Sequence, residues 1–225
     1  MSDVPTIPDS MEENLRCGGA YRGRPLAAVC LLALLAAVSG CGPHVPAIAP
    51  LAPGATIVAF GDSITYGTGA EPAESYPAVL QEMSGHPVVN AGVPGEVSGE
   101  GLLRLPGVLD QERPSLLILC HGGNDLLRRD PEDRLALNLA RMADLAAARG
   151  IPVILIGVPK PAVFLRTAAV YTDVAREKNL PLEDRTLAAI EAEPSLKSDP
   201  IHPNREGYRR MAHDVLALLE KSGAL

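Results

Sequence analysis

Five short apolar runs, separated by segments with helical spacing, constrain the fold of this 225-residue chain. Each run is continuous rather than alternating, which is typical of strands covered on both faces of a sheet. The predicted strands are residues 56–60, 87–90, 115–120, 152–157 and, with a weaker pattern, 180–183. The predicted helices are residues 75–83, 101–109, 132–149, 167–178 and 205–222. Strands that alternate with helices in this way predict a parallel sheet in a three-layer α/β/α sandwich of the doubly wound type.

The first forty residues are typical of an export signal. Residues 26–38 (LAAVCLLALLAAV) are apolar and uncharged, with arginines before them and the small residues Ser39 and Gly40 after them. This arrangement predicts a cleaved signal peptide, and the run is short for a transmembrane span. Residues 38–41 (VSGC) resemble the bacterial lipobox, which implies that Cys41 becomes the lipidated first residue of the mature protein. A plain cleaved leader and a transmembrane anchor are the alternatives. The predicted division is a signal peptide over residues 1–40, a Pro-rich tether over 41–54 and one domain over 55–225.

Composition narrows the partners that such a domain can have. The chain has a formal net charge of −7 and only 3% aromatic residues. It therefore lacks the basic stripe that binds nucleic acid and the aromatic side chains that stack on bases or sugars. Beyond the leader and Cys41, Cys120 is the only cysteine, so we expect no disulfide within the domain. We expect an exported protein that contacts the membrane through its lipid anchor, on the periplasmic side or the cell surface, with no nucleic-acid partner and no obligate protein partner.

Four polar turns carry the side chains that could do chemistry. They are residues 61–65 (GDSIT), 90–95 (NAGVPG), 121–125 (HGGND) and 199–204 (DPIHPN). Because the carboxyl ends of parallel strands meet at one edge of a sheet, these turns can converge. His202 can act as the base for Ser63, and Asp199 can orient the His202 ring. The backbone N–H groups of Ser63 and Gly95 and the side-chain amide of Asn124 could bind an oxyanion, which completes the parts needed for acyl transfer.

In order and spacing, the same turns resemble the sequence blocks of the SGNH (GDSL) hydrolases. GDSITYG resembles block I, Gly95 block II, GGND block III and DPIHPN block V. Residues 94–128 are similar to the thioesterase I, lysophospholipase L1 and arylesterase branch. The resemblance implies a flavodoxin-like, five-stranded sheet in the order 2-1-3-4-5 and an acyl-enzyme mechanism. It also implies a catalytic triad of Ser63, Asp199 and His202 and an oxyanion hole of Ser63, Gly95 and Asn124. The chain departs from the family at residues 96–97 (EV), where relatives often have Asp-Thr, so it lacks a hydroxyl that could steady this loop.

Some of these residues also have structural explanations. Ser63 alone could cap the following helix, and we expect Asp62 to tie the turn together rather than touch substrate. Asp125 is expected to cap a helix or brace a loop. Cys120 and His121 are neighbours on a strand and face opposite sides, so they cannot form a nucleophile pair, and Cys120 is expected in the core. The other histidines lack metal-ligand spacing, and we expect neither a metal nor a cofactor.

The substrate is the least constrained part of the prediction. Residues 157–165 (GVPKPAVFL) follow the fourth predicted strand and could line an acyl pocket or cover the sheet. An apolar pocket would suit acyl or aryl esters and thioesters, lysophospholipids among them. A carbohydrate O-acetyl esterase is the alternative, which the scarcity of aromatic residues disfavours. A lipid- or glycan-binding lipoprotein on an inactive hydrolase scaffold is a second alternative, although a binding protein needs no serine paired with a base.

Overall fold

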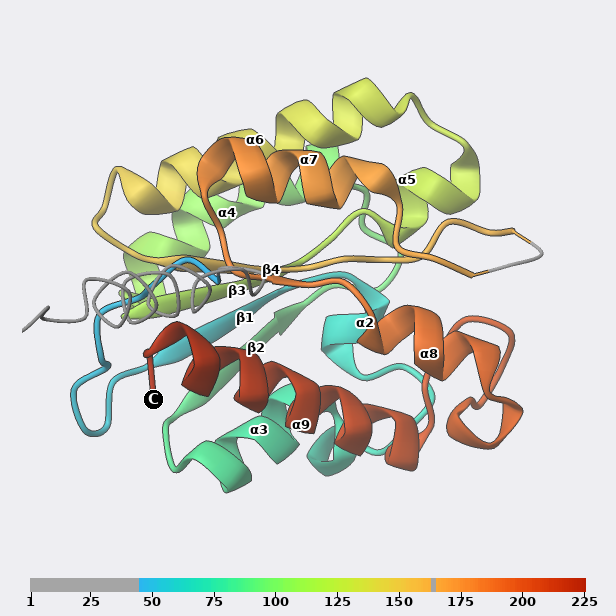
Figure 1. Ribbon diagram of the computed structural model, residues 1–225, viewed down its shortest axis with the longest axis horizontal. Coiled ribbons are helices and arrows are strands. Elements are labelled where there is room, and N and C mark those ends of the chain that lie inside the picture. Colours follow the sequence, from blue (N-terminus) through green and yellow to red (C-terminus); the bar gives the residue numbers. More distant parts are fainter. Residues whose placement is uncertain (1–44, 163–164) are drawn as a thin grey trace, which may run out of the picture. The chain divides into compact units, whose positions relative to one another are not determined.

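The computed structural model describes residues 45–162 and 165–225, and these contain the whole predicted sheet (Figure 1). Its strands are β1 (Ile57–Gly61), β2 (Val88–Gly92), β3 (Leu116–Cys120), β4 (Val153–Ile156) and β5 (Leu182–Glu183). All pairs are parallel, in the order β2-β1-β3-β4-β5. The predicted α/β fold and the strand order implied by the resemblance are therefore confirmed. The predicted signal peptide and Cys41 lie outside the described residues.

The centre of the sheet forms because its strands are apolar on both faces. Every residue of β1 and β3 is buried, as continuous apolar runs require in a covered parallel sheet. The register pairs Ile57 with Val88 on one side and with Leu116 on the other, so β1, β2 and β3 end at the same level. The turns that follow these three strands consequently start from one edge of the sheet.

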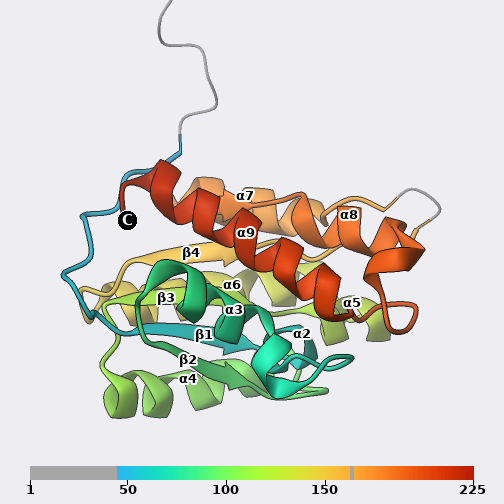
Figure 2. The same cartoon turned by 90° about the horizontal axis from the view of Figure 1, so that it is seen from below.

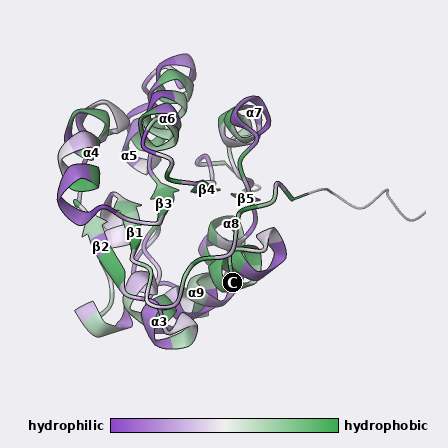
Figure 3. Cartoon of the chain, turned by 90° about the vertical axis from the view of Figure 1, so that its left-hand side faces the viewer, coloured by the Kyte–Doolittle hydropathy of each residue, from purple (hydrophilic) through white to green (hydrophobic). Residues whose placement is uncertain are grey.

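Helices cover both faces of this sheet (Figures 1 and 2). One face carries α4 (Ser98–Glu112), α5 (Gly123–Arg128), α6 (Glu132–Ala147) and α7 (Ala169–Lys178). The other carries α2 (Ser63–Tyr66), α3 (Tyr76–Ser84), α8 (Thr186–Ala192) and α9 (Arg205–Ser222). The strands between them are mainly hydrophobic, whereas the helices carry both hydrophobic and hydrophilic residues (Figure 3). This is the three-layer arrangement predicted from the sequence.

The helices differ from the predicted ones mainly at their ends. The predicted helix over residues 101–109 is longer at both ends in α4. It starts earlier because the Glu100 side chain accepts a hydrogen bond from the backbone N–H of Val97 and closes the first turn. Helix α9 begins as predicted: the Asn204 side chain accepts hydrogen bonds from the N–H groups of Glu206 and Gly207. The short helices α2, α5 and α8, and the 3₁₀ turns at Pro72–Glu74 and Pro194–Leu196, were not predicted, because one or two turns give little periodicity.

Part of the segment predicted as a tether lies along the domain. The backbone N–H of Ile48 donates to the carbonyl of Ser222, and that of Leu51 donates to Ala224, each at 2.8 Å. The Ile48 side chain is buried against the core. Residues 48–51 are thus fastened to the end of α9, at the opposite edge of the sheet from the four polar turns (Figure 2). Within residues 45–162 and 165–225, no helix is both long enough and apolar enough to cross a bilayer.

Candidate active site

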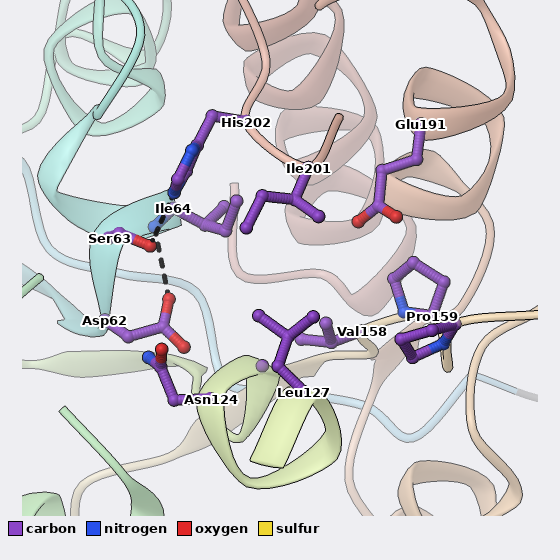
Figure 4. Close-up of a pocket in the computed structure, with 12 residues that line it drawn as sticks. Asp62, Ser63, Ile64, Asn124, Leu127, Val158, Pro159, Glu191, Ile201 and His202 are labelled. Atoms are coloured by element: carbon purple, nitrogen blue, oxygen red, sulfur yellow. Dashed lines mark hydrogen bonds between the residues drawn. The ribbon is translucent and has the colours of Figure 1, made fainter. Parts of the chain in front are cut away.

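The first and last of the four turns bring Ser63, His202 and Asp199 into one hydrogen-bonded chain, of which Figure 4 shows Ser63 and His202. Ser63 begins α2 directly after β1, and His202 lies in the loop before α9. The Ser63 Oγ is 3.0 Å from the His202 Nε2, and the His202 Nδ1 is 2.6 Å from the Asp199 Oδ2. Serine and histidine are 139 residues apart in the chain, so only the fold brings them together.

Asp199 shapes its own loop as well as holding the histidine ring. Its Oδ1 accepts hydrogen bonds from the backbone N–H groups of Ile201 and His202, at 2.9 and 2.8 Å, while its Oδ2 faces the ring. Partial burial raises the pKa of Asp199, but the hydrogen bonds from Ile201 and His202 outweigh it and hold the pKa below its ordinary value. Asp199 is therefore a carboxylate that can fix the tautomer of His202 and stabilise its imidazolium form.

Asp62 supports the turn that presents the serine. Its Oδ1 accepts a hydrogen bond from the backbone N–H of Ile64 at 3.1 Å and so caps α2. The side chain is buried, and this burial raises the pKa of Asp62. The predicted role of Asp62 in tying the turn together is confirmed. Ser63 begins α2, and its hydroxyl also lies beside the His202 ring.

Asn124 faces the same pocket from the turn after β3. It lines the pocket together with Ser63 and His202, and its Nδ2 donates to the backbone carbonyl of Glu96 at 3.0 Å. Gly122 precedes it with a φ of 109°, and a Cβ there would lie 2.6 Å from side-chain atoms of Leu135 and Tyr171. Glycine is therefore required for the backbone to turn at this point. One amide hydrogen of Asn124 fixes the side chain, and within residues 45–162 and 165–225 no hydrogen bond uses the other.

The loop that carries Gly95 lies against Asn124. Gly95 has a φ of 81°, and its carbonyl accepts a hydrogen bond from the Arg128 Nη2 at 3.1 Å. Glu96 follows it, and the Glu96 backbone N–H donates to Val93 at 3.2 Å. Gly95 itself does not line the pocket, so its predicted N–H donor role stays a prediction, whereas Ser63 and Asn124 do line it. The structure thus brings together at one edge the turns that the sequence singled out.

Comparison with known proteins decides the family. The model of the GDSL-like lipase/acylhydrolase family matches residues 59–210, which include all four turns. The chain belongs to this family. It is 32% identical over 176 residues to the esterase TesA of Pseudomonas aeruginosa, a match covering 73% of this chain and 88% of that protein. It is also 32% identical over 160 residues to the thioesterase 1/protease 1/lysophospholipase L1 of Escherichia coli, covering 67% of this chain and 76% of that protein.

A solved structure agrees with these sequence relatives. A crystal structure of TesA superposes with a TM-score of 0.69 at 31% identity, and the match covers 74% of this chain and 99% of that chain. The protein is thus an esterase-type hydrolase of the GDSL family. The superposition extends over nearly the whole of TesA, so the shared part is the complete α/β domain.

Behind the loop that carries Gly95 in this GDSL hydrolase lies a charged cluster that the sequence did not reveal. The Glu96 carboxylate accepts hydrogen bonds from the Arg104 Nε and Nη2, at 2.8 and 2.6 Å, and lies 3.0 Å from the His121 Nε2. Burial raises the pKa of Glu96, but the bonds from Arg104 and His121 outweigh it and lower the pKa to about 2. The Arg104 guanidinium also stacks over the Phe60 ring at 4.2 Å. This ion pair holds the loop that carries Gly95.

A second buried group connects the third turn to α4. The Asp125 carboxylate accepts hydrogen bonds from the backbone N–H and the hydroxyl of Ser98, at 2.8 and 2.5 Å. Asn138 on α6 donates to the same hydroxyl at 2.9 Å. Of the two roles predicted for Asp125, the structure shows the loop brace. Cys120 is buried as predicted, and burial raises the pKa of its thiol, which leaves it inert.

The remaining walls of the pocket are mostly apolar. Val158, Pro159 and Pro161 line it, so the described part of residues 157–165 contributes to the pocket as well as to the cover of the sheet. Ile64, Leu127 and Ile201 also belong to the apolar lining. Glu191, at the end of α8, is the exception, and sequence reasoning missed it because α8 itself was not predicted.

Proposed function

We propose that this GDSL hydrolase cleaves acyl or aryl esters and thioesters, lysophospholipids among them, through an acyl-enzyme intermediate on Ser63. The observation that carries the proposal is the chain of contacts at 3.0 and 2.6 Å from Ser63 through His202 to Asp199, which opens into a pocket with apolar walls. The names of the two relatives, an esterase and a thioesterase/lysophospholipase, support the substrate class.

The proposed reaction has two halves. The Ser63 Oγ attacks the carbonyl carbon while the His202 Nε2 takes its proton, and the Asn124 amide with the Ser63 and Gly95 N–H groups stabilises the tetrahedral oxyanion. His202 then gives the proton to the departing alcohol or thiol, which leaves an ester on Ser63. Water attacks that ester with His202 again as the base, and Ser63 is restored.

A panel of substrates tests this function. We expect hydrolysis of p-nitrophenyl esters, an acyl-CoA and a lysophosphatidylcholine to depend on Ser63, with the preferred chain length read from the ester series. The Ser63→Ala variant is the matched control. Hydrolysis that is equal in the wild type and in Ser63→Ala would overturn the mechanism. Hydrolysis confined to acetylated sugars would replace the proposed substrate class by carbohydrate O-acetyl esters.

We also propose that the protein is exported and anchored by lipid at Cys41. The support is the apolar run of residues 26–38 and the lipobox-like residues 38–41. A mature chain should begin at a diacylglyceryl-modified Cys41 and sediment with membranes, since two acyl chains anchor firmly. Cys41→Ala should block processing or release a soluble form that is still active. An unmodified mature chain that begins elsewhere would contradict the anchor, and mass measurement of the N-terminus distinguishes the two.

A further inference from the structure

Glu191 places a carboxyl group inside the pocket, across from the serine and histidine. It lies at the end of α8, and Figure 4 shows its carboxyl group pointing into the space between Ile201 and Pro159. Ser63 and His202 lie on the other side of the same pocket. The part of a substrate that fills this pocket beside Ser63 therefore shares it with the Glu191 carboxyl group.

This carboxyl group has no partner within residues 45–162 and 165–225, where neither a hydrogen bond nor an ion pair reaches it. Lys197, whose charge acts on this carboxyl group, instead donates from its Nζ to the backbone carbonyl of Glu191 at 2.6 Å. The side chain is half-buried, and this burial raises the pKa of Glu191 to about 7 against the opposing effect of Lys197. An unpaired carboxylate in a half-buried position destabilises the folded protein. Leu187 and Ile190 already hold α8 in the core, so the fold does not need the Glu191 side chain.

The lining of the pocket is asymmetric in charge. Two carboxyl groups, Asp62 and Glu191, belong to it, and none of the described residues that line it is lysine or arginine. Asp62 is occupied by its hydrogen bond from Ile64, so Glu191 is the carboxyl group that a ligand could use. Around it lie Pro159 and Ile201, whose apolar surfaces suit the methyl groups of a quaternary ammonium.

We propose, on the basis of the proposed ester hydrolysis, that Glu191 is a specificity-determining residue that selects substrates by charge. It favours esters with a cationic group, such as an ammonium, in the part of the molecule that fills the pocket, and it disfavours anionic ones. A cation supplies the partner that the carboxylate lacks, and the half-buried setting strengthens the attraction relative to a fully exposed pair. An uncharged group of the same shape makes only the apolar contacts.

Two pairs of esters of equal shape test this selection on the full-length protein. Butyrylcholine and 3,3-dimethylbutyl butyrate differ only in a trimethylammonium or a tert-butyl group on the alcohol side. The p-nitrophenyl esters of 4-(trimethylammonio)butyrate and 5,5-dimethylhexanoate differ in the same way on the acyl side. The kcat/KM ratio of cationic to neutral ester should be about fivefold to tenfold higher in the wild type than in Glu191→Gln, for the pair whose charged part fills the pocket.

The control variant is Glu220→Gln, which removes the same charge from an exposed position on α9 and should keep the wild-type ratio. The ratio should also fall as pH drops from about 8 to about 6, because Glu191 takes up a proton. Asp62 and His202 share the pocket, and Lys197 lies nearby. Their effects on the reaction apply to both esters of a pair and cancel in the kcat/KM ratio. In Glu191→Gln this ratio should therefore not change with pH.

The possible outcomes distinguish the charge selection by Glu191 from the proposed ester hydrolysis at Ser63. Equal ratios in the wild type and in Glu191→Gln for both pairs, together with Ser63-dependent hydrolysis of the neutral esters, would overturn the charge selection and leave the esterase intact. An equal fall of the ratio in Glu220→Gln would also overturn it, because net charge would then explain the effect. Hydrolysis of no ester beyond the level of Ser63→Ala would overturn both the proposed function and the inference that rests on it.

Discussion

Asp199 and His202 lie 3 residues apart in the chain, whereas Asn124 donates to the backbone of Glu96 at a separation of 28 residues. The two sides of the active site differ in burial as well. The Asp199 side chain is 43% exposed, and that of Glu96 only 6%. The triad side (Ser63, Asp199 and His202) therefore depends on a short turn open to solvent. The oxyanion side (Glu96, Arg104, His121 and Asn124) depends on buried and half-buried polar contacts, which include contacts between residues 25 and 28 positions apart.

Because of this difference in burial, we expect the two sides to contribute differently to catalysis and to stability. A buried polar group that loses its partner destabilises the fold, but an exposed one regains water. Changes on the triad side should consequently reduce activity and leave the free energy of unfolding nearly unchanged. Changes on the oxyanion side should reduce both.

The largest effect is expected on the triad side. Ser63→Ala should lower kcat/KM by on the order of 10³ or more, because the nucleophile is lost, while the melting temperature stays within about 2 °C. His202→Ala should be similarly inactive, and the double variant should lose little beyond either single one, since the two residues act as a unit. Steady-state kinetics and thermal unfolding check this. A melting temperature lowered by ~10 °C in Ser63→Ala would break the distinction between the two sides.

Asn124→Ala should lower kcat by about 10² to 10³ with a smaller change in KM, because the amide acts on charge that develops in the transition state. It should also cost about 1 kcal/mol of stability, since the Glu96 carbonyl loses its donor. A change confined to KM would instead make Asn124 a substrate-binding residue, which kinetics on p-nitrophenyl esters would show.

Arg104→Met should affect stability more than Asn124→Ala does. It leaves the buried Glu96 carboxylate with His121 alone and should cost about 2–4 kcal/mol in the free energy of unfolding. The loosened loop should lower kcat by roughly tenfold.

Asp199→Asn is the counterpart of Arg104→Met on the triad side: it should lower kcat strongly and leave the denaturant midpoint almost unchanged. Equal losses of stability in the two variants would refute the proposed difference.

The last effect concerns acid and bears on stability alone. The folded protein lowers the pKa of Glu96 from 4.5 to about 2, so the carboxylate stabilises the fold above pH ~4.5, and this contribution is lost as pH falls toward 2. Between pH ~4.5 and ~3 the loss should be about 2 kcal/mol in the wild type. Glu96→Gln should show a correspondingly flatter dependence when urea unfolding is measured across this range. Parallel curves for the two proteins would contradict the cause assigned to the shift.

The contrast between local signals and contacts made only by the fold explains which features the sequence could predict. The strands and the turns after them were predictable because continuous apolar runs and Gly-rich turns are local signals. The Asp199–His202 pair was predictable because both residues lie in one turn. The ion pair between Glu96 and Arg104 was not, because nothing in the sequence shows that these side chains face each other behind the loop. Glu191 was missed for the related reason that α8 is too short to show a period.

Reaction with a fluorophosphonate, followed by mass measurement of the intact protein and its peptides, tests the central claim most directly. Such a probe forms a stable bond only with a serine activated by a base. The account predicts a single adduct on Ser63 that is absent from Ser63→Ala and much slower to form in His202→Ala. A folded wild-type protein that takes up no probe, or an adduct that persists in Ser63→Ala, would contradict it.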